Sequence, residues 1–256
     1  MSGKSESFDP RDNCILYGFR GSIAHNLFVP SGEMATDDRD YMGVCICPVD
    51  YYLGIKKFEQ YQSMVGKNDI IIYDIRKFFS LLMKCNPNVL SFMFNERRMI
   101  PDITNAGQVL LDNVDMFLCA PKVYKAFAGY AKSQIKKMES GVGYQGYMGE
   151  KRKKLYDRFG YDTKNAAHLI RLLKMGIELL STGNMQVYRV ADRSELLAIK
   201  EGLWSIENVK AKAKNLFEAL RLSLETTVLP PKQNLDDINN LLIDILCAEL
   251  EVNNGY

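Results

Sequence analysis

The sequence predicts a mixed α/β (α+β) fold, with a sheet in the N-terminal part of the chain and mostly helices in the C-terminal part. Short apolar runs typical of buried strands occur in the first third of the sequence. From about residue 121 these runs fade, and apolar residues recur with the 3.6-residue period of helices. We therefore expect two domains, an α/β domain over residues 1–120 and a helical domain over residues 121–256.

Three segments of the first domain have the apolar character of buried strands: residues 14–17, 41–47 and 70–73. Asp74 follows the third segment and is placed to cap a helix, because aspartate accepts hydrogen bonds from the free N–H groups of a first helical turn. The apolar residues after it have helical spacing: Ile75, Phe78, Phe79, Leu82 and Met83. We expect this helix to end at the Asn-Pro-Asn sequence of residues 86–88.

Five segments of the second domain show helical periodicity: residues 121–139, 162–182, 192–201, 205–225 and 234–250. Between the first two lie four glycines in residues 141–149, followed by the basic run 151–154. An exposed loop that leads into a solvated helix accounts for this segment, and a loop that contacts phosphate is the alternative.

Composition and charge exclude several classes of protein. Of the 256 residues, 47% are apolar and 25% are charged, which excludes a disordered or collagen-like chain. The net charge of +2 means that any site for a polyanion must be local. The apolar runs are far shorter than the ~18 residues of a membrane span, the N-terminus lacks the apolar region of a secretion signal, and the cysteines form no CxxC pair. We expect a reduced cytoplasmic protein without membrane contact.

The residues that indicate chemistry lie between the first two predicted strands. Asp38 and Asp40 stand at the start of the second strand, where side chains two residues apart share a face and Arg39 points away. Two carboxylates aimed at one spot are typical of a site for Mg²⁺, a hard cation that prefers oxygen ligands and takes the rest from water and phosphate.

A Gly-Ser pair follows the first predicted strand and complements these carboxylates. Gly21 allows the backbone to approach a phosphate, and Ser22 offers a hydroxyl and an N–H group as donors. Two cations about 3.5–4 Å apart can activate an attacking hydroxyl and stabilise a leaving pyrophosphate. Each half of this pattern is common in proteins, but the two halves together favour nucleotidyl transfer over a solvated turn.

This arrangement closely resembles the nucleotidyltransferase superfamily typified by DNA polymerase beta, whose signature is a Gly-Ser pair followed by Asp-x-Asp or Asp-x-Glu. Residues 69–94, 129–138 and 161–184 look like the bacterial and phage branch of that superfamily associated with RNA repair. The resemblance implies a catalytic palm in the first domain, a helical domain packed against it, an NTP substrate, Mg²⁺ or Mn²⁺, and an RNA 3′ end as the acceptor.

The superfamily usually supplies a third carboxylate from a neighbouring strand, and Asp69 and Asp74 bracket the third predicted strand. Because Asp74 is placed to cap a helix, Asp69 is our choice, although a turn residue is an equally good description of it. Asp37 is expected to point away from Asp38. The predicted catalytic and metal-binding set is Asp38, Asp40 and Asp69.

One predicted helix carries a set of basic residues. Lys164, His168 and Arg171 lie at i, i+4 and i+7, so their side chains share a narrow face, with Glu178 as a single acidic neighbour. The resemblance includes these three positions and implies that they bind the triphosphate together with Gly21 and Ser22. A solvated helix surface or an ion pair with the first domain is the alternative.

The sequence departs from this branch at one point. The residue after Gly-Ser is commonly Arg, whereas Ile23 stands here and Arg20 precedes the glycine, so a phosphate-binding cation has moved or is missing. His25 either contacts nucleotide or acceptor, or is a hydrogen-bonded structural residue.

The most favoured function is transfer of a nucleoside monophosphate from an NTP to a hydroxyl, with an RNA 3′ end as the acceptor that the resemblance implies. An alternative is transfer to a protein or a tRNA in a toxin or phage-defence setting. A nucleotide-binding protein without turnover is an alternative of another class, supported by the Ile23 departure.

Overall fold

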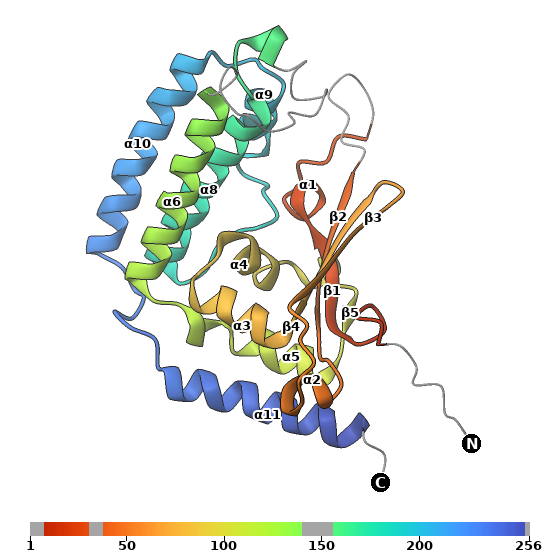
Figure 1. Ribbon diagram of the computed structural model, residues 1–256. Coiled ribbons are helices and arrows are strands. Elements are labelled where there is room, and N and C mark those ends of the chain that lie inside the picture. Colours follow the sequence, from red (N-terminus) through yellow and green to blue (C-terminus); the bar gives the residue numbers. More distant parts are fainter. Residues whose placement is uncertain (1–7, 31–37, 140–155, 254–256) are drawn as a thin grey trace.

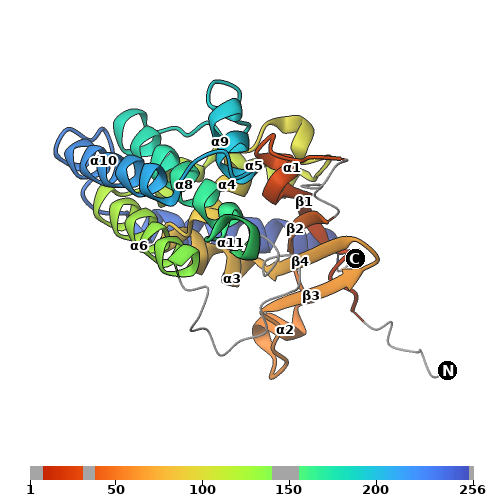
Figure 2. The same ribbon diagram turned by 90° about the horizontal axis from the view of Figure 1, so that it is seen from above.

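The computed structural model describes residues 8–30, 38–139 and 156–253. A sheet forms one layer of the molecule, and helices cover one of its faces (Figure 1). The view from above shows that the helices of the C-terminal half lie beside each other on that side (Figure 2). This layered arrangement agrees with the mixed α/β fold that the sequence predicts.

The sheet has five strands in the order β3-β4-β2-β1-β5. The strands are β1 (Cys14–Arg20), β2 (Arg39–Cys45), β3 (Gln60–Val65), β4 (Asn68–Asp74) and β5 (Asp102–Ile103). β2 and β4 are parallel, and the other pairs are antiparallel. The start of β2 therefore lies beside the start of β4 and the end of β1.

All three predicted strands are present, with shifted bounds. The first continues beyond Gly18 to Arg20, because Gly18 serves close packing and does not make a turn: a Cβ there would lie 2.3 Å from the backbone oxygen of Met99. The second strand begins at Arg39, so Asp38 directly precedes it. β3 and β5 escaped prediction, because β3 is a largely exposed edge strand and β5 has two residues.

Helices of the N-terminal half connect and cover the strands: α1 (Gly21–Ala24), α2 (Asp50–Leu53), α3 (Ile75–Met83), α4 (Pro87–Met93) and α5 (Asn105–Asp112). The predicted cap of α3 is confirmed, since Asp74 accepts a hydrogen bond from the N–H of Arg76 at 3.0 Å. The Asn-Pro-Asn sequence separates α3 from α4, whose first N–H groups bind the side chain of Asn86.

The five predicted C-terminal helices are all observed: α6 (Ala120–Glu139), α8 (Thr163–Thr182), α9 (Arg193–Lys200), α10 (Ile206–Glu225) and α11 (Leu235–Asn253). α8 packs against α6, α9 and α10, while α11 packs against α5 (Figure 1). The glycines of residues 141–149 and the basic run 151–154 lie outside the described residues.

The apolar core crosses the expected domain boundary without a break. One buried cluster contains Leu16 of β1, Phe79 of α3, and Leu169 and Leu173 of α8. Phe79 and Phe117 meet edge to face with their ring centroids 5.0 Å apart. The sheet and the helices therefore hold each other in place. In the described part of the chain, no helix is long and apolar enough to cross a membrane.

Candidate active site

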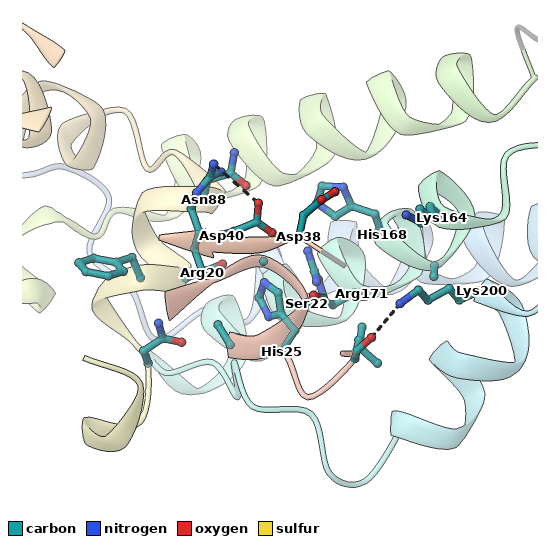
Figure 3. A pocket seen from close by; sticks show the side chains of 17 residues that line it. Arg20, Ser22, His25, Asp38, Asp40, Asn88, Lys164, His168, Arg171 and Lys200 are labelled. Carbon is teal, nitrogen blue, oxygen red and sulfur yellow. Dashed lines mark hydrogen bonds and ion pairs between the residues drawn. The ribbon is translucent and has the colours of Figure 1, made fainter. Parts of the chain in front are cut away.

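A cavity of about 420 Å³ opens where the end of β1 and the start of β2 meet α4, α8 and α9 (Figure 3). It is lined by residues from both halves of the chain: Arg20, Gly21, Ser22, Ala24, His25, Leu27, Asp38, Asp40, Asn88, Ser91, Phe92, Asn95, Lys164, Ala167, His168, Arg171 and Lys200. Every predicted site residue except Asp69 is among them.

Gly21 brings the turn after β1 against the second strand. Its φ of +64° lies in the left-handed region, which favours glycine. A Cβ at this position would lie 2.0 Å from Oδ2 of Asp40. Only a residue without a side chain therefore permits this approach, and the Gly-Ser turn is in contact with the Asp40 carboxylate.

Ser22 follows in the short helix α1 and lines the cavity. Its Oγ is buried, and no hydrogen-bond partner for it exists among the described residues. Buried hydroxyl groups are normally satisfied, so an unsatisfied one at a cavity wall indicates a polar ligand.

The register of the sheet brings the second and third predicted carboxylates together. Asp40 of β2 pairs directly with Asp69 of the parallel strand β4, so both side chains lie on the same face, the one that the helices cover. Asp38 is exposed at the entrance to β2 and lines the cavity beside Asp40. We call the Gly21-Ser22 turn with Asp38 and Asp40 the acidic wall.

Arg20 occupies the space between the two strand carboxylates. Its Nη2 lies 2.6 Å from Oδ2 of Asp69 and 3.9 Å from Oδ1 of Asp40, and its Nε donates to the backbone oxygen of Tyr41 at 3.1 Å. The cation that the sequence places before the Gly-Ser pair therefore binds the carboxylates. Asp69 is held behind Arg20 and does not line the cavity.

Crowding of like charges affects Asp40. Burial raises the pKa of its carboxyl group above the ordinary value, Asp69 and Asp38 raise it further, and Arg20 and Lys164 act in the opposite direction. The neutral form of this carboxyl group is therefore favoured more than it is in water, and a cation bound beside it would act against that shift.

The carboxylates of the acidic wall suit a divalent cation by their chemistry, although they are not gathered around a ready site. Within residues 8–30, 38–139 and 156–253, no three His, Cys, Asp or Glu side chains are gathered as a ready metal site, and Asp69 is engaged with Arg20 instead. The chemistry of the donors nevertheless fits Mg²⁺ or Mn²⁺, because all are carboxylate oxygens. Oδ1 of Asp69 is buried and has no hydrogen-bond partner in the described part of the chain, which also favours a bound cation.

The opposite side of the cavity is basic. Lys164, His168 and Arg171 of α8 all line it, as their helical spacing predicts (Figure 3). Burial lowers the pKa of Arg171 to about 9, with a further contribution from Arg189. The Nε of Arg171 is buried and has no hydrogen-bond partner among the described residues.

Glu178, the expected acidic neighbour of these residues, pairs with a different residue. Its carboxylate pairs with Arg189 at 2.8 Å and also accepts from the N–H of Gln186. Glu178 therefore binds the segment between α8 and α9 and is not available to the basic residues of α8. A ligand with several negative charges would complement the face of α8 that lines the cavity.

Lys200, the last residue of α9, completes this side and was missed by the sequence reasoning. Its side chain is 6% exposed and lines the cavity, and its Nζ donates to the backbone oxygen of Leu27 at 2.8 Å. No local pattern marks this residue, because its contacts come from a segment 173 positions away. We call Lys164, His168, Arg171 and Lys200 the basic wall.

Polar residues around α4 were also missed. Asn88, Ser91 and Asn95 also line the cavity. Asn95 donates to the backbone oxygen of Phe19 at 2.9 Å, and Ser91 donates to that of Pro87 at 2.6 Å. Asn88 and Ser91 lie on α4 and Asn95 lies just after it. The three residues were not singled out, since the sequence favours a core role for this segment.

His25 is a buried residue that joins the two halves. It is 4% exposed, and its Nδ1 lies 3.1 Å from the backbone oxygen of Val187. Burial, and after it the charge of Arg171, hold its pKa well below the ordinary value, so the ring is neutral. This contact supports the structural role, although the residue also lines the cavity.

Comparison with known proteins identifies the family. No curated protein sequence matches the chain significantly. Among solved structures, the chain resembles a nucleotidyltransferase-like protein from Exiguobacterium sibiricum 255-15, with 11% sequence identity, a TM-score of 0.29 and coverage of 86% of this chain and 70% of that chain. The RNA repair pathway DNA polymerase beta family, in contrast, matches residues 16–244. The chain therefore belongs to this family and is a nucleotidyltransferase of the polymerase beta type.

Proposed function

We propose that this protein transfers a nucleoside monophosphate from an NTP to the 3′ hydroxyl of an RNA, with Mg²⁺ or Mn²⁺ as cofactor. The observation that carries this proposal is the cavity itself, in which a Gly-Ser turn and two carboxylates face a basic wall. A metal-bound triphosphate needs both kinds of wall, because its phosphates bind cations and its metal binds carboxylates.

The Gly-Ser turn would hold the phosphate groups nearest the reaction. Ser22 has a buried hydroxyl without a partner among the described residues, and that hydroxyl can donate to a phosphate oxygen. Gly21 keeps the turn within contact of Asp40. Lys164, His168 and Arg171 would bind the remaining phosphates from the opposite wall.

Asp38, Asp40 and Asp69 would hold the divalent cations. A bound Mg²⁺ or Mn²⁺ supplies neutralising charge at the transferred phosphoryl group and at the leaving pyrophosphate. Asp69 would join this set through Oδ1, which has no hydrogen-bond partner among the described residues, while its Oδ2 lies 2.6 Å from Nη2 of Arg20. A carboxylate of this set is the natural acceptor for the proton of the attacking hydroxyl, and Asp40 lines the cavity in contact with the Gly-Ser turn.

The acceptor is assigned from the RNA repair pathway of the family, and one labelling experiment tests it. The protein is incubated with each α-³²P-labelled NTP, Mg²⁺ or Mn²⁺, and three acceptors: a single-stranded RNA, the same RNA without its 3′ hydroxyl, and a mixture of tRNA and cell protein. We expect label on the RNA that carries a free 3′ hydroxyl and none on the blocked RNA.

Other outcomes of this experiment would overturn the proposal in distinct ways. Label on protein or tRNA alone would identify the alternative acceptors. Binding of NTP without label on any acceptor and without pyrophosphate release would indicate a nucleotide-binding protein that lacks turnover.

A further inference from the structure

The sheet has a second face, on the side away from the C-terminal helices. Figures 1 and 2 show α6, α8 and α10 together on the other side of the sheet. Three aromatic side chains lie next to each other on the second face: Tyr17 and Phe19 of β1 and Tyr41 of β2. The rings of Tyr17 and Tyr41 are stacked with centroids 5.5 Å apart, and the ring of Phe19 lies 4.9 Å from that of Tyr41. We call these three residues the aromatic row.

Strand alternation assigns the aromatic row to this face. Asp40 lies on the face that the helices cover, so its neighbour Tyr41 points away from them, and Phe19 is the direct partner of Tyr41 in the ladder. All three rings are partly exposed. Tyr17 and Tyr41 also pack against a small buried cluster, but Phe19 belongs to neither apolar cluster of the described chain. Phe19 is therefore held at the surface by its neighbours and adds little to the core.

Two cations lie at one end of the aromatic row. Arg39 precedes Tyr41 by two residues on the same face of β2, which is about 7 Å along a strand. Lys67 is adjacent, since its backbone oxygen accepts from the N–H of Arg39 at 2.8 Å. Both side chains are exposed, and neither has a hydrogen-bond or ion-pair partner among the described residues. The acidic neighbour of the row, Asp102, pairs with Tyr17 at the other end.

The cationic end of the row adjoins the cavity across one edge of the sheet. Phe19 is separated from the Gly-Ser turn by one residue, and Arg39 stands between Asp38 and Asp40 of the acidic wall. Because successive side chains of a strand alternate between its faces, the two carboxylates line the cavity while Arg39 points to the side of the row. A nucleic acid whose 3′ hydroxyl lies at the acidic wall can leave the cavity over this edge, where it meets the two cations and Phe19.

We propose that the aromatic row, together with Arg39 and Lys67, binds the single-stranded part of the RNA acceptor next to its 3′ end. The inference rests on the proposed function and assigns to the acceptor a surface outside the cavity. Aromatic rings stack on bases of any sequence, and exposed cations bind the phosphate groups between them. The two cations beside the rings favour a polyanion over an apolar peptide as the occupant of this face.

The experiment measures the dissociation constant of a fluorescent single-stranded RNA dodecamer by anisotropy, without NTP and at several salt concentrations. Phe19→Leu removes a ring and keeps an apolar side chain, whereas Phe19→Trp keeps a ring. The double variant Arg39→Gln/Lys67→Gln removes both cations. Lys214→Gln is the matched control, because it removes an exposed lysine of α10, which lies away from the sheet (Figure 1).

We expect Phe19→Leu to weaken RNA binding by about 5- to 50-fold, which is the range for loss of one stacked base, and Phe19→Trp to bind like wild type. The double variant should also weaken binding. It should reduce the slope of the logarithm of affinity against the logarithm of salt concentration by about 1.4, since each phosphate contact of a single strand contributes ~0.7. Lys214→Gln should keep the affinity and the slope of wild type.

NTP affinity and thermal unfolding of each variant separate this role from a structural one. An equal loss of NTP affinity and RNA affinity in Phe19→Leu would show that the ring only supports the Gly-Ser turn. Unchanged RNA binding in Phe19→Leu and in the double variant would exclude this face as the path of the acceptor. In that case wild-type protein that still labels the 3′ end of a dinucleotide, which reaches only the cavity, would leave the proposed function intact. Wild-type protein that labels no RNA of either length would overturn the proposed function together with this inference.

Discussion

The acidic wall and the basic wall of the cavity are built in different ways. The acidic wall depends on strand register, which sets Asp40 beside Asp69, and on one glycine that lets a turn reach the Asp40 carboxylate. The basic wall depends on the helical repeat of α8 and on the packing of α9, which adds Lys200. Strand register thus determines which carboxylates are neighbours within the acidic wall. Helix packing determines how far the basic wall lies from the acidic wall.

Each wall brings groups of like charge together, and the pKa values of these groups are shifted toward the neutral form. The carboxyl group of Asp40 has a raised pKa, while Arg171 and Lys200 have lowered pKa values. In each case burial is the first cause and neighbours of the same sign add to it. Such an arrangement is unfavourable for the empty protein and favourable for a complex with cations on one side and phosphates on the other.

A short segment couples the walls mechanically. After α1, the backbone oxygens of His25, Asn26 and Leu27 accept hydrogen bonds from the C-terminal half, donated by the N–H of Arg189 at 3.4 Å, Nε of Arg193 at 2.9 Å and Nζ of Lys200 at 2.8 Å. The Gly-Ser turn therefore takes part of its position from the helices. Substitutions that change one wall and leave the other intact test this comparison.

The largest effect is expected from Asp40→Asn, which removes the carboxylate while keeping its shape. Pyrophosphate release should fall by about 10³-fold or more, because loss of a metal ligand removes several kcal/mol of transition-state stabilisation. Asp115→Asn, at an exposed position in the N-terminal half, is the matched control and should retain wild-type turnover. Equal rates for wild type and Asp40→Asn would refute the role of the acidic wall.

Asp69→Ala and Asp74→Ala should separate chemistry from stability within one strand. Asp69→Ala should lower turnover by about 10²-fold through loss of a metal ligand. Its effect on stability should be small, because Arg20 also lies 3.9 Å from Asp40. Asp74→Ala should lower the free energy of unfolding by about 2 kcal/mol, since Asp74 is 1% exposed, caps α3 and accepts from the hydroxyl of Tyr52 at 2.8 Å.

Turnover and urea unfolding of these two variants measure the separation. The assignment of Asp69 as the third carboxylate is wrong if Asp74→Ala is the variant that loses turnover at full stability.

Gly21→Ala and Gly66→Ala should show how much depends on the contact between the Gly-Ser turn and Asp40. Both glycines have positive φ values, +64° and +62°, so either substitution costs about 1 kcal/mol of stability. A Cβ at Gly66 meets nothing within 4 Å, whereas one at Gly21 collides with Asp40. Gly21→Ala alone should lose turnover, by about 10- to 100-fold, because the carboxylate is displaced.

Thermal unfolding and pyrophosphate release of both variants make this comparison. Similar turnover losses in the two would attribute the effect to backbone strain.

The smallest expected effect is a pH dependence of stability that comes from Lys200. Its pKa is about 8 in the folded protein against an ordinary value of 10.5, so the unfolded chain binds this proton more tightly. The lysine therefore destabilises the fold at low pH, and this penalty disappears as the pH rises from about 8 to above 10.5. Without ligand, the melting temperature of wild type relative to Lys200→Met should rise by about 2–5 °C between pH 7 and pH 10. A constant or falling difference would show that the folded-state pKa is not lowered.

Local rules were sufficient for part of the site. The i, i+4 and i+7 spacing predicted that Lys164, His168 and Arg171 share a face of α8, and all three line the cavity. The position of Asp74 before a helical repeat predicted its cap, which the bond to the N–H of Arg76 confirms. Each of these patterns lies within one element and its immediate neighbours, where a repeat or a free N–H group decides the geometry.

Contacts between distant segments could not be predicted in this way. Arg20 binds Asp69 across 49 positions, and Lys200 binds Leu27 across 173. Glu178 lies on the predicted face of α8 but pairs with Arg189. In each case several partners of suitable charge are present in the sequence, and only the packing of the chain selects one.

The sequence alone determined the strands β1, β2 and β4, the helix α3 and the five C-terminal helices. It also determined the Gly-Ser and Asp-x-Asp signature and the family to which it belongs, because all of these depend on periodicity and on short spacings. The tertiary structure decided which charges face each other across the cavity. It placed Arg20 between the carboxylates and added Lys200 to the basic wall, since side chains from distant segments become neighbours only when the sheet and the helices share one core.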